Sequence, residues 1–437
     1  MVWYLELIIL GCAIVFFFSA GIPVAFAFGM INILGLYFFC GGEVMFNLLA
    51  TSAYASVAAF PMVAIPMFIM MGEILTRTGT VELSFNAVQK WLRRLPGNLA
   101  IISMASATLF GALSGASMAA CAAIGSIMMP EMYKRGYNKK LIAGVIIGGA
   151  GLDVLIPPSI LMVIFASLSD LSVGKLLIGG TVPGVILSAF YVLMILTIAI
   201  FFPHMAPRVE FERSSLMEKI VASKHLIAMG VLIFLVLGLI YLGVASATEA
   251  AALGAGGSLL IAALYKRLTW KNFMESINHT VRVSSMIFLI FTGSKAFSQI
   301  LAITGASTEL ANYVTSLELN RWWILIMMQL VILIMGCLME SMSIMVVMVP
   351  IYMPIVYKLG FDPIWFAILT MINIEVGLMT PPFGMNLFVT RGIAPQGITM
   401  SDIYVGVLPF ISLHFLVMGL VMVMPGLATF IPSMMSK

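Results

Sequence analysis

The sequence predicts an all-α polytopic membrane protein with an internal duplication, and three observations support this fold class. Of the 437 residues, 62% are apolar and only 9% are charged, with a mean hydropathy of +1.13. Soluble domains carry about 25% charged residues. Apolar segments of membrane-spanning length follow one another along most of the chain, and a Pro-Pro pair inside one of them recurs inside another. This composition excludes a soluble enzyme.

The apolar segments set the number of membrane elements. A membrane helix needs about 20 apolar residues, so the length allows roughly ten to twelve elements. Residues 1–53 are expected to form N-terminal scaffold helices, and 204–283 a cytoplasmic loop followed by linking scaffold helices. The predicted segments fall at about 3–19, 22–40, 54–76, 98–130, 141–168, 176–203, 226–245, 249–265, 284–303, 322–356, 362–390 and 402–431.

Two segments are too long for one simple helix and carry small or polar residues at their midpoints. The first, about 98–130, is centred on Leu113-Ser-Gly-Ala-Ser117, and the second, about 322–356, on Met339-Glu-Ser-Met-Ser343. Non-helical backbone at membrane depth is tolerated only where protein or a cavity satisfies its polar groups. Each segment is therefore predicted to form a re-entrant helical hairpin that enters and leaves on one side of the membrane.

Two further segments, about 141–168 and 362–390, are interrupted centrally by Pro157-Pro158 and by Pro381-Pro382. Proline lacks a backbone donor and clashes with the preceding helical turn. Both segments are therefore predicted to be broken transmembrane helices whose freed carbonyls line a cavity or bind a ligand.

The Pro-Pro pairs belong to an internal repeat. They are separated by 224 residues, and Gly111 pairs with Gly336 at a separation of 225. Each copy reads as a span, an amphipathic connector, a hairpin, a broken span and a final span. The two copies are expected to occupy 54–203 and 284–437.

The distribution of basic residues indicates that the copies are inverted. Sixteen of the 22 Lys and Arg residues cluster in 77–94, 134–140, 208–224 and 266–282, and basic loops face the cytoplasm. Threading the segments on that rule places both termini in the periplasm and opens the two hairpins to opposite sides. Inverted repeats with broken helices are typical of secondary transporters that bind their ligands at the midplane.

The hairpin tips and the Pro-Pro breaks combine unpaired carbonyls with small polar side chains, which predicts sodium sites. Sodium is a hard cation, and carbonyl and hydroxyl oxygens are the ligands that hard cations prefer. The alternative is that the small residues only allow close helix packing. The predicted ligands, most of them through backbone oxygen, are Gly111, Ser114, Ser117, Asp153, Ile156 and Pro158 in the first copy, and Gly336, Gly377, Thr380 and Phe383 in the second.

An anionic substrate needs polar or charged partners within the membrane, where every ionisable residue is costly. Ser159 and Asn386 lie just past the Pro-Pro breaks, where the positive ends of half-helices meet a carboxylate or sulfonate. Glu340 lies at the second hairpin tip. Lys295 is predicted either to pair with the substrate or to neutralise one of the intramembrane carboxylates, among them Glu375.

The sequence shows no enzyme constellation. The four histidines are scattered, so neither a metal pair nor a nucleophile with its base is evident. The prediction is a non-enzyme without a covalent cofactor, in which sodium serves as the coupling ion.

Three motifs resemble the large, DctM-type membrane subunit of tripartite ATP-independent periplasmic (TRAP) transporters. They are Gly111-Ala-Leu-Ser-Gly-Ala-Ser117, Leu155-Ile-Pro-Pro-Ser159 and Thr380-Pro-Pro-Phe-Gly-Met-Asn-Leu-Phe-Val389, and the resemblance runs over essentially the whole chain. It implies an elevator-type importer of small organic acid anions that is driven by a sodium gradient. It also implies a small four-helix membrane subunit, a periplasmic substrate-binding protein and a location in the bacterial inner membrane.

One residue departs from the family pattern, which commonly has Gly at the position of Asp153. There are three alternatives for the Asp153 carboxylate: it strengthens the first sodium site, it binds a group of the substrate, or it alters that sodium site. We favour a stronger sodium site, because added negative charge attracts a cation. An alternative for the whole chain is a self-sufficient sodium and organic-anion symporter without a binding protein. A third possibility, an intramembrane enzyme or a passive channel, lacks the required catalytic pair or continuous polar face.

Overall fold

The computed structural model describes residues 3–39, 44–92, 95–208 and 216–435, which form helices and their connections and contain no strand. Within these ranges eight helices are long and apolar enough to cross a membrane. The predicted all-α, multi-span fold class is therefore confirmed.

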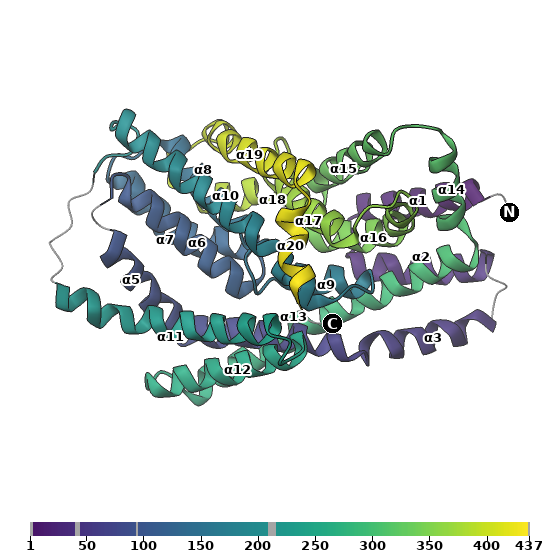
Figure 1. The fold of residues 1–437 in the computed structure, drawn as a ribbon, viewed down its shortest axis with the longest axis horizontal. Coiled ribbons are helices and arrows are strands. Elements are labelled where there is room, and N and C mark those ends of the chain that lie inside the picture. Colours follow the sequence, from purple (N-terminus) through teal and green to yellow (C-terminus); the bar gives the residue numbers. More distant parts are fainter. Residues whose placement is uncertain (1–2, 40–43, 93–94, 209–215, 436–437) are drawn as a thin grey trace.

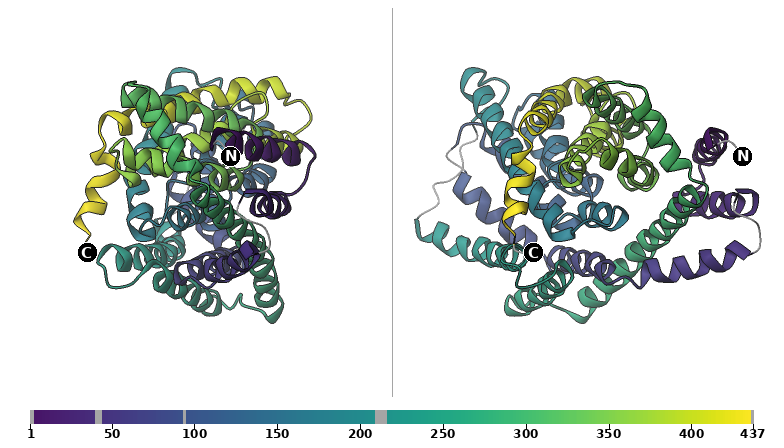
Figure 2. Two further views of the ribbon diagram at one scale, coloured as in Figure 1. Left: turned by 90° about the vertical axis from the view of Figure 1, so that its right-hand side faces the viewer. Right: turned by 45° about the vertical axis from the view of Figure 1, so that its right-hand side comes forward.

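A long layer of helices runs along one side of the molecule, with α3, α11, α12 and α13 at the lower edge of Figure 1 and of the right view of Figure 2. Helix α13 packs against α2, α3 and α4, and α4 packs against α12. We call this set the frame. It consists of α1 (Trp3–Ser19), α2 (Val24–Phe39), α3 (Val44–Val57), the 3-10 helix η1 (Phe60–Val63), α4 (Ala64–Arg77), α11 (Leu216–Tyr241), α12 (Ala247–Leu264) and α13 (Trp270–Ile303).

A second group of helices lies above α3, α11, α12 and α13 in Figure 1. Within it α8 packs against α6 and α19, α15 against α17, and α18 against α7. We call the four helix pairs of this group the block. They are α6 (Asn98–Ser114) with α7 (Ser117–Lys134), α8 (Lys139–Ala150) with α9 (Ile160–Leu168), α15 (Arg321–Leu338) with α16 (Ser341–Lys358), and α17 (Pro363–Met379) with α18 (Met385–Ile393).

The remaining helices connect or flank the block. One short helix precedes the first pair of each half, one long helix follows the second pair, and a further short helix follows at the end of the second half. They are α5 (Thr80–Leu92), α10 (Val173–Phe201), α14 (Ala306–Ser316), α19 (Met400–Val423) and α20 (Gly426–Met434). The same order, a short helix, two helix pairs and a long helix, therefore occurs twice along the chain.

Glycine allows α8 and α19 to pack closely. A Cβ atom added to Gly148 would overlap the Phe410 ring, and one added to Gly406 would overlap the Lys140 carbonyl. Small residues let helix backbones approach in this way, which is the usual basis of helix packing in membranes. The block is thus held tightly against α19.

Several boundaries differ from the sequence-based expectation, and two of these differences have a clear physical cause. The predicted segment 54–76 is divided, because Pro61 at the start of η1 cannot continue the helix from α3. The stretch 270–283, expected to be a basic loop, is the first part of α13, which begins at the Thr269 cap. Its polar side chains pair with α4, so the helix continues although its sequence is not apolar.

Candidate functional site

Two helices of the block begin at tips between paired helices. Helix α6 ends before Gly115, which has a left-handed φ of +67°, and α7 follows the extended Ala116. Helix α15 ends before the extended Met339 and Glu340, and α16 begins at once after them. The chain is non-helical at both tips, where the sequence predicts polar midpoints.

The other two helices begin at the Pro-Pro breaks. Residues 151–159 join α8 to α9, and 380–384 join α17 to α18, without forming a helix. The Pro157–Pro158 and Pro381–Pro382 peptide bonds are both cis. The predicted sodium ligands Asp153, Ile156 and Pro158 lie in the first break, and Thr380 and Phe383 lie in the second.

Three helices that start at the tips and breaks carry no side-chain cap. The residues before α7, α9 and α18 are Ala116, Ser159 and Gly384, and none of them bonds a first-turn amide through its side chain. In contrast, Asn138 caps α8 and Asp362 caps α17. Uncapped first-turn N–H groups and the positive end of the helix dipole favour an anion.

The end of α6 packs on the first break, and the end of α15 packs on the end of α17, just before the second break. A Cβ atom added to Gly111 would lie 2.7 Å from Cβ of Asp153, and one added to Gly336 would lie 2.7 Å from Cα of Gly377. Glycine on the hairpin helix allows this approach, because a side chain at Gly111 would collide with the Asp153 side chain and one at Gly336 with the Gly377 backbone. The structure therefore brings the predicted ligands together in two pairs, Gly111 with Asp153 and Gly336 with Gly377.

The two halves meet at Glu375. The Ser117 hydroxyl, on the first residue of α7, donates to Oε1 of Glu375 over 3.2 Å. A Cβ atom added to Gly151 would lie 3.2 Å from Oε2 of Glu375, and Asp153 is close enough for the two carboxylates to interact through space. The tip and the break of the first half thus converge on the broken helix of the second.

At the repeat spacing of 224 residues, each of these two acids corresponds to a glycine in the other half. Adding 224 to Asp153 gives Gly377, and subtracting 224 from Glu375 gives Gly151. Each half therefore carries one carboxylate and one glycine, in exchanged positions. Both acids are buried, with 1% of each residue exposed.

Several polar atoms at this junction lack hydrogen-bond partners among the described residues. They include both carboxylate oxygens of Asp153, Oε2 of Glu375, and both side-chain polar atoms of Asn386, which is completely buried. Burying a polar group without a partner costs about 1–3 kcal/mol, and more for a charge. Such a cluster is suited to holding a ligand.

Helix packing places Asn386 near the same junction. A Cβ atom added to Gly125 of α7 would overlap Ile393 of α18, and one turn earlier Cys121 lies beside Thr390. The residue numbers decrease together along α7 and α18 in these two contacts, so the helices are parallel. One further turn towards their starts leads to Ser117 on α7 and Asn386 on α18. The uncapped starts of α7 and α18 are therefore neighbours.

The donor set is rich in oxygen and poor in metal-binding side chains. No group of three or more His, Cys, Asp or Glu residues within the described ranges is placed to hold a metal ion. The oxygens available at the tips, the breaks and the adjoining α17 are carbonyls, hydroxyls and the carboxylates of Asp153, Glu340 and Glu375, which suit a hard cation.

Two other predicted site residues, Thr380 and Glu340, have local partners, and two more, Phe383 and Ser114, are described only by position or exposure. The Thr380 hydroxyl donates to the Val376 carbonyl over 2.6 Å. The Glu340 carboxylate lies beside the first-turn amides of its own helix, at Met342 and Ser343, so it occupies a helix end. The Phe383 side chain is exposed. Ser114 ends α6, and its side chain lies outside the described part of the structure.

Lys295 lies apart from these residues. Its ammonium pairs with Oδ1 of Asp170 over 3.0 Å and points to the last carbonyl of α9, at Leu168. Ser159 begins the same helix, so about 13 Å of α9 separate the two predicted substrate residues. The prediction that Lys295 pairs with an intramembrane carboxylate is wrong, because its partner is Asp170. Asp170 lies in the connection between α9 and α10, outside the predicted apolar segments.

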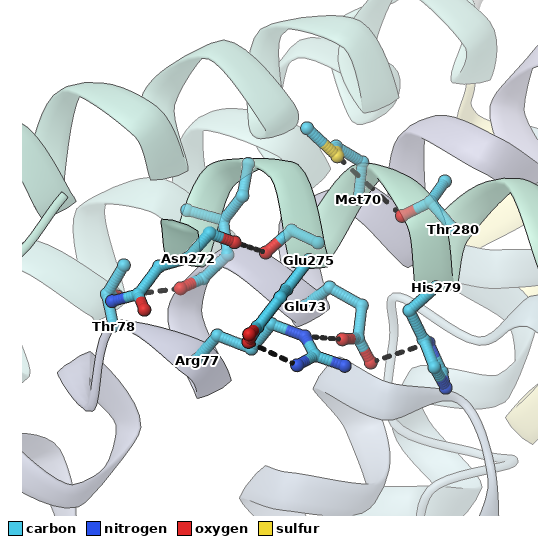
Figure 3. Close-up of polar contacts among 10 residues, drawn as sticks. Met70, Glu73, Arg77, Thr78, Asn272, Glu275, His279 and Thr280 are labelled. Atoms are coloured by element: carbon cyan, nitrogen blue, oxygen red, sulfur yellow. Dashed lines mark hydrogen bonds and ion pairs between the residues drawn. The ribbon is translucent and has the colours of Figure 1, made fainter. Parts of the chain in front are cut away.

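Glu73 belongs to a polar cluster between α4 and α13 (Figure 3). Its carboxylate pairs with Arg77 over 2.7 Å and with His279 over 3.0 Å, and Arg77 also pairs with Glu275 over 3.1 Å. This cluster joins two frame helices. Glu249, another acid in an apolar segment, forms a capping box with Ser246.

The sequence places Glu375 within the membrane but does not predict its position between the two halves. Its partner Ser117 is 258 residues away, and no spacing rule connects the tip of one half with the broken helix of the other. The only sequence signal for this contact is the repeat, in which each of the two carboxylates corresponds to a glycine in the other half.

A family model described as the DctM component of tripartite ATP-independent periplasmic transporters matches residues 10–427. The chain belongs to this family. The resemblance carried by the hairpin-tip and Pro-Pro motifs is thereby confirmed. Members of this family are transporter components, so the chain belongs with transporters and not with enzymes.

Curated relatives match nearly the whole chain. The C4-dicarboxylate TRAP transporter large permease protein DctM of Rhodobacter capsulatus is 32% identical, over 98% of this chain and 99% of the relative. The isethionate TRAP transporter permease protein DctMQ of Oleidesulfovibrio alaskensis is 31% identical, over 95% of this chain and 64% of the relative.

A solved structure shares the fold at low sequence identity. The YdaH transporter of Alcanivorax borkumensis, described as having an unusual topology, superimposes with a TM-score of 0.55. The match covers 89% of this chain and 88% of the other, with 11% identical residues. This likeness concerns the fold alone.

Proposed function

We propose that the chain imports a small organic acid anion, a carboxylate or sulfonate, by an elevator mechanism driven by a sodium gradient. A periplasmic substrate-binding protein delivers the anion, and a small four-helix membrane subunit completes the transporter. The observation that carries this proposal is the convergence of both halves on Glu375, where unpartnered oxygens and uncapped helix starts meet in the buried centre of the block.

Sodium occupies the two places where a tip packs on a break. In the first, the ligands come from Gly111, Ser117 and the break around Asp153; in the second, they come from Gly336, Gly377 and the break after Thr380. The close approach of Gly111 to Asp153 and of Gly336 to Gly377 supports a site formed by two segments at each place. The Asp153 carboxylate adds negative charge to the first site.

The substrate anion lies between the two sodium sites, at the starts of α9 and α18. Ser159 and Asn386 supply polar side chains there, and the helix dipoles supply partial positive charge. The names of the relatives include a C4-dicarboxylate and isethionate transporter. These ligands carry carboxylate or sulfonate groups, which is the chemistry that uncapped helix starts accept.

The two halves are inverted repeats, and the block moves against the frame. The tips and breaks pack on one another within the block, so they move together as one unit, whereas α4, α12 and α13 pack on one another in the frame. Both termini face the periplasm of a bacterial inner membrane, and the basic clusters, which favour cytoplasmic loops, support this orientation. The small subunit docks on the frame.

Uptake into proteoliposomes tests this function. The chain is reconstituted with its small subunit, and labelled succinate and isethionate are offered with and without an inward sodium gradient and a candidate binding protein. We expect uptake only when sodium and the binding protein are both present. Sodium-driven uptake without a binding protein would favour the self-sufficient symporter, and uptake without sodium would refute the coupling.

A further inference from the structure

A cavity of about 480 Å³ lies away from the tips and breaks, between the frame and the far end of α9. It is bounded by α3, η1 and α13 on the frame side and by the connection between α9 and α10 on the other. Polar and charged side chains line one part of it. They are Ser56, Ser167, Asp170, Lys295 and Gln299.

The cationic group of this cavity is Lys295. Its ammonium contacts Asp170 and the Leu168 carbonyl, and it lies 5.9 Å from the centre of the Phe291 ring. About a quarter of the side chain is exposed, against 86% of the Asp170 side chain. A lysine within an apolar helix is costly unless it is paired or functional.

The backbone around Lys295 is held in place by its neighbours. The Gly293 carbonyl accepts a hydrogen bond from Asn32 of α2 over 2.7 Å, and the Ser294 hydroxyl donates to the Val346 carbonyl of α16 over 2.8 Å. Three successive residues of α13 therefore make polar contacts with three different elements. Lys295 is presented to the cavity from a fixed position.

Asp170 is the replaceable member of the pair. It has a left-handed φ of +55° in a short connection, and most of its carboxylate faces solvent. Exposed ion pairs are weak, because water competes for both charges. A free carboxylate or sulfonate of similar size offers Lys295 the same interaction.

We propose that Lys295 is an anion-capture site in which Asp170 holds the place of the substrate's acidic group until the substrate replaces it. The site takes a small carboxylate or sulfonate and lies at the opposite end of α9 from Ser159. It rests on the proposed function, and on the proposed orientation it opens to the periplasm. Breaking the Asp170 contact also releases a link between the frame and the block.

Chemical protection of Lys295 tests the site without transport. The chain, purified with its small subunit, is treated with acetic anhydride, and acetylation of Lys295 is followed by mass spectrometry at increasing succinate. We expect succinate to protect Lys295, and the half-protecting concentration to fall about two- to five-fold in Asp170→Asn, in line with the strength of an exposed ion pair. Lys175 serves as the reference lysine.

Three outcomes would overturn the proposal. The first is the absence of protection by succinate in both proteins, which would make the pair a structural link only. The second is equal protection of Lys295 by uncharged succinamide, and the third is equal protection of Lys175 by succinate. If succinate protects Lys295 while sodium-driven uptake fails, the capture site stands and the proposed coupling falls.

A second variant keeps the test informative if Asp170→Asn folds poorly. We expect Lys295→Gln to raise the KM for succinate in the complete transporter and Lys295→Arg to retain most of the affinity, with Lys175→Gln as the matched control. An unchanged KM in a folded Lys295→Gln transporter would contradict the proposal.

Discussion

Asp153 and Glu375 place two carboxylates in the buried centre of the block, and each stands where the other half of the chain has glycine. A buried negative charge needs a cation or hydrogen bonds to offset its lost hydration. Glu375 has one bond from Ser117, and Asp153 has none among the described residues. This arrangement suits a cation-binding role for both acids.

Replacing Asp153 by Gly tests its proposed role in the first sodium site. The fold tolerates glycine there, because Gly377 fills the related position beside Gly336. Loss of a charge next to a bound cation is expected to raise the half-saturating sodium concentration for uptake by about tenfold or more. Asp402→Asn, which removes an acidic group at the start of α19 away from Asp153, is the control. An unchanged sodium dependence would remove Asp153 from the site.

A double-mutant cycle tests whether Glu375 serves the same cation. Glu375→Gln keeps an oxygen to accept from Ser117 but removes the charge. We expect the effects of Asp153→Gly and Glu375→Gln on sodium half-saturation to be non-additive by about 0.5–3 kcal/mol, as for residues that share a partner. Additive effects would place the two acids at independent sites.

Among the elements, the glycine contacts between tips and breaks explain why the helix pairs stay together. Gly336 touches the backbone of Gly377, so α15 and α17 approach closely. We expect Gly336→Ala to destabilise the purified protein by about 1–3 kcal/mol through overpacking, measured as a lower midpoint of thermal unfolding. Gly419→Ala is the control, since nothing lies near that position. Equal stability of both variants would contradict this packing.

Element boundaries could be predicted where backbone chemistry decides them. Proline and glycine mark the breaks at 151–159 and 380–384, because these residues act locally. The start of α13 could not be predicted in this way. Its first turns are polar, and their stability comes from ion pairs such as that between Arg77 and Glu275, 198 residues apart.

The candidate site was predictable only in part, for a related reason. The members of each tip and break were identified from local sequence and from the repeat, and the structure brings Gly111 to Asp153 and Gly336 to Gly377. The contact between Ser117 and Glu375 depends on how the halves pack. So does the pairing of Lys295 with Asp170, which no periodicity marks.

At the scale of the whole molecule, the helices are divided into a frame and a block. If the small subunit docks on the frame, as proposed, photo-reactive residues in it are expected to crosslink mainly to α1, α2, α11 and α12. Crosslinks are mapped by mass spectrometry in the assembled complex. Crosslinks concentrated at Ser114 or Thr380 would show instead that the partner contacts the block.

The central claim is that sodium and the organic anion cross the membrane together, and coupled flux tests it most directly. Radioactive sodium and labelled succinate are followed in the same proteoliposomes, with the small subunit and the binding protein present. The account predicts that sodium entry depends on succinate and the binding protein, and that succinate entry depends on sodium, in a fixed ratio. Succinate entry at an unchanged rate without sodium movement would contradict it.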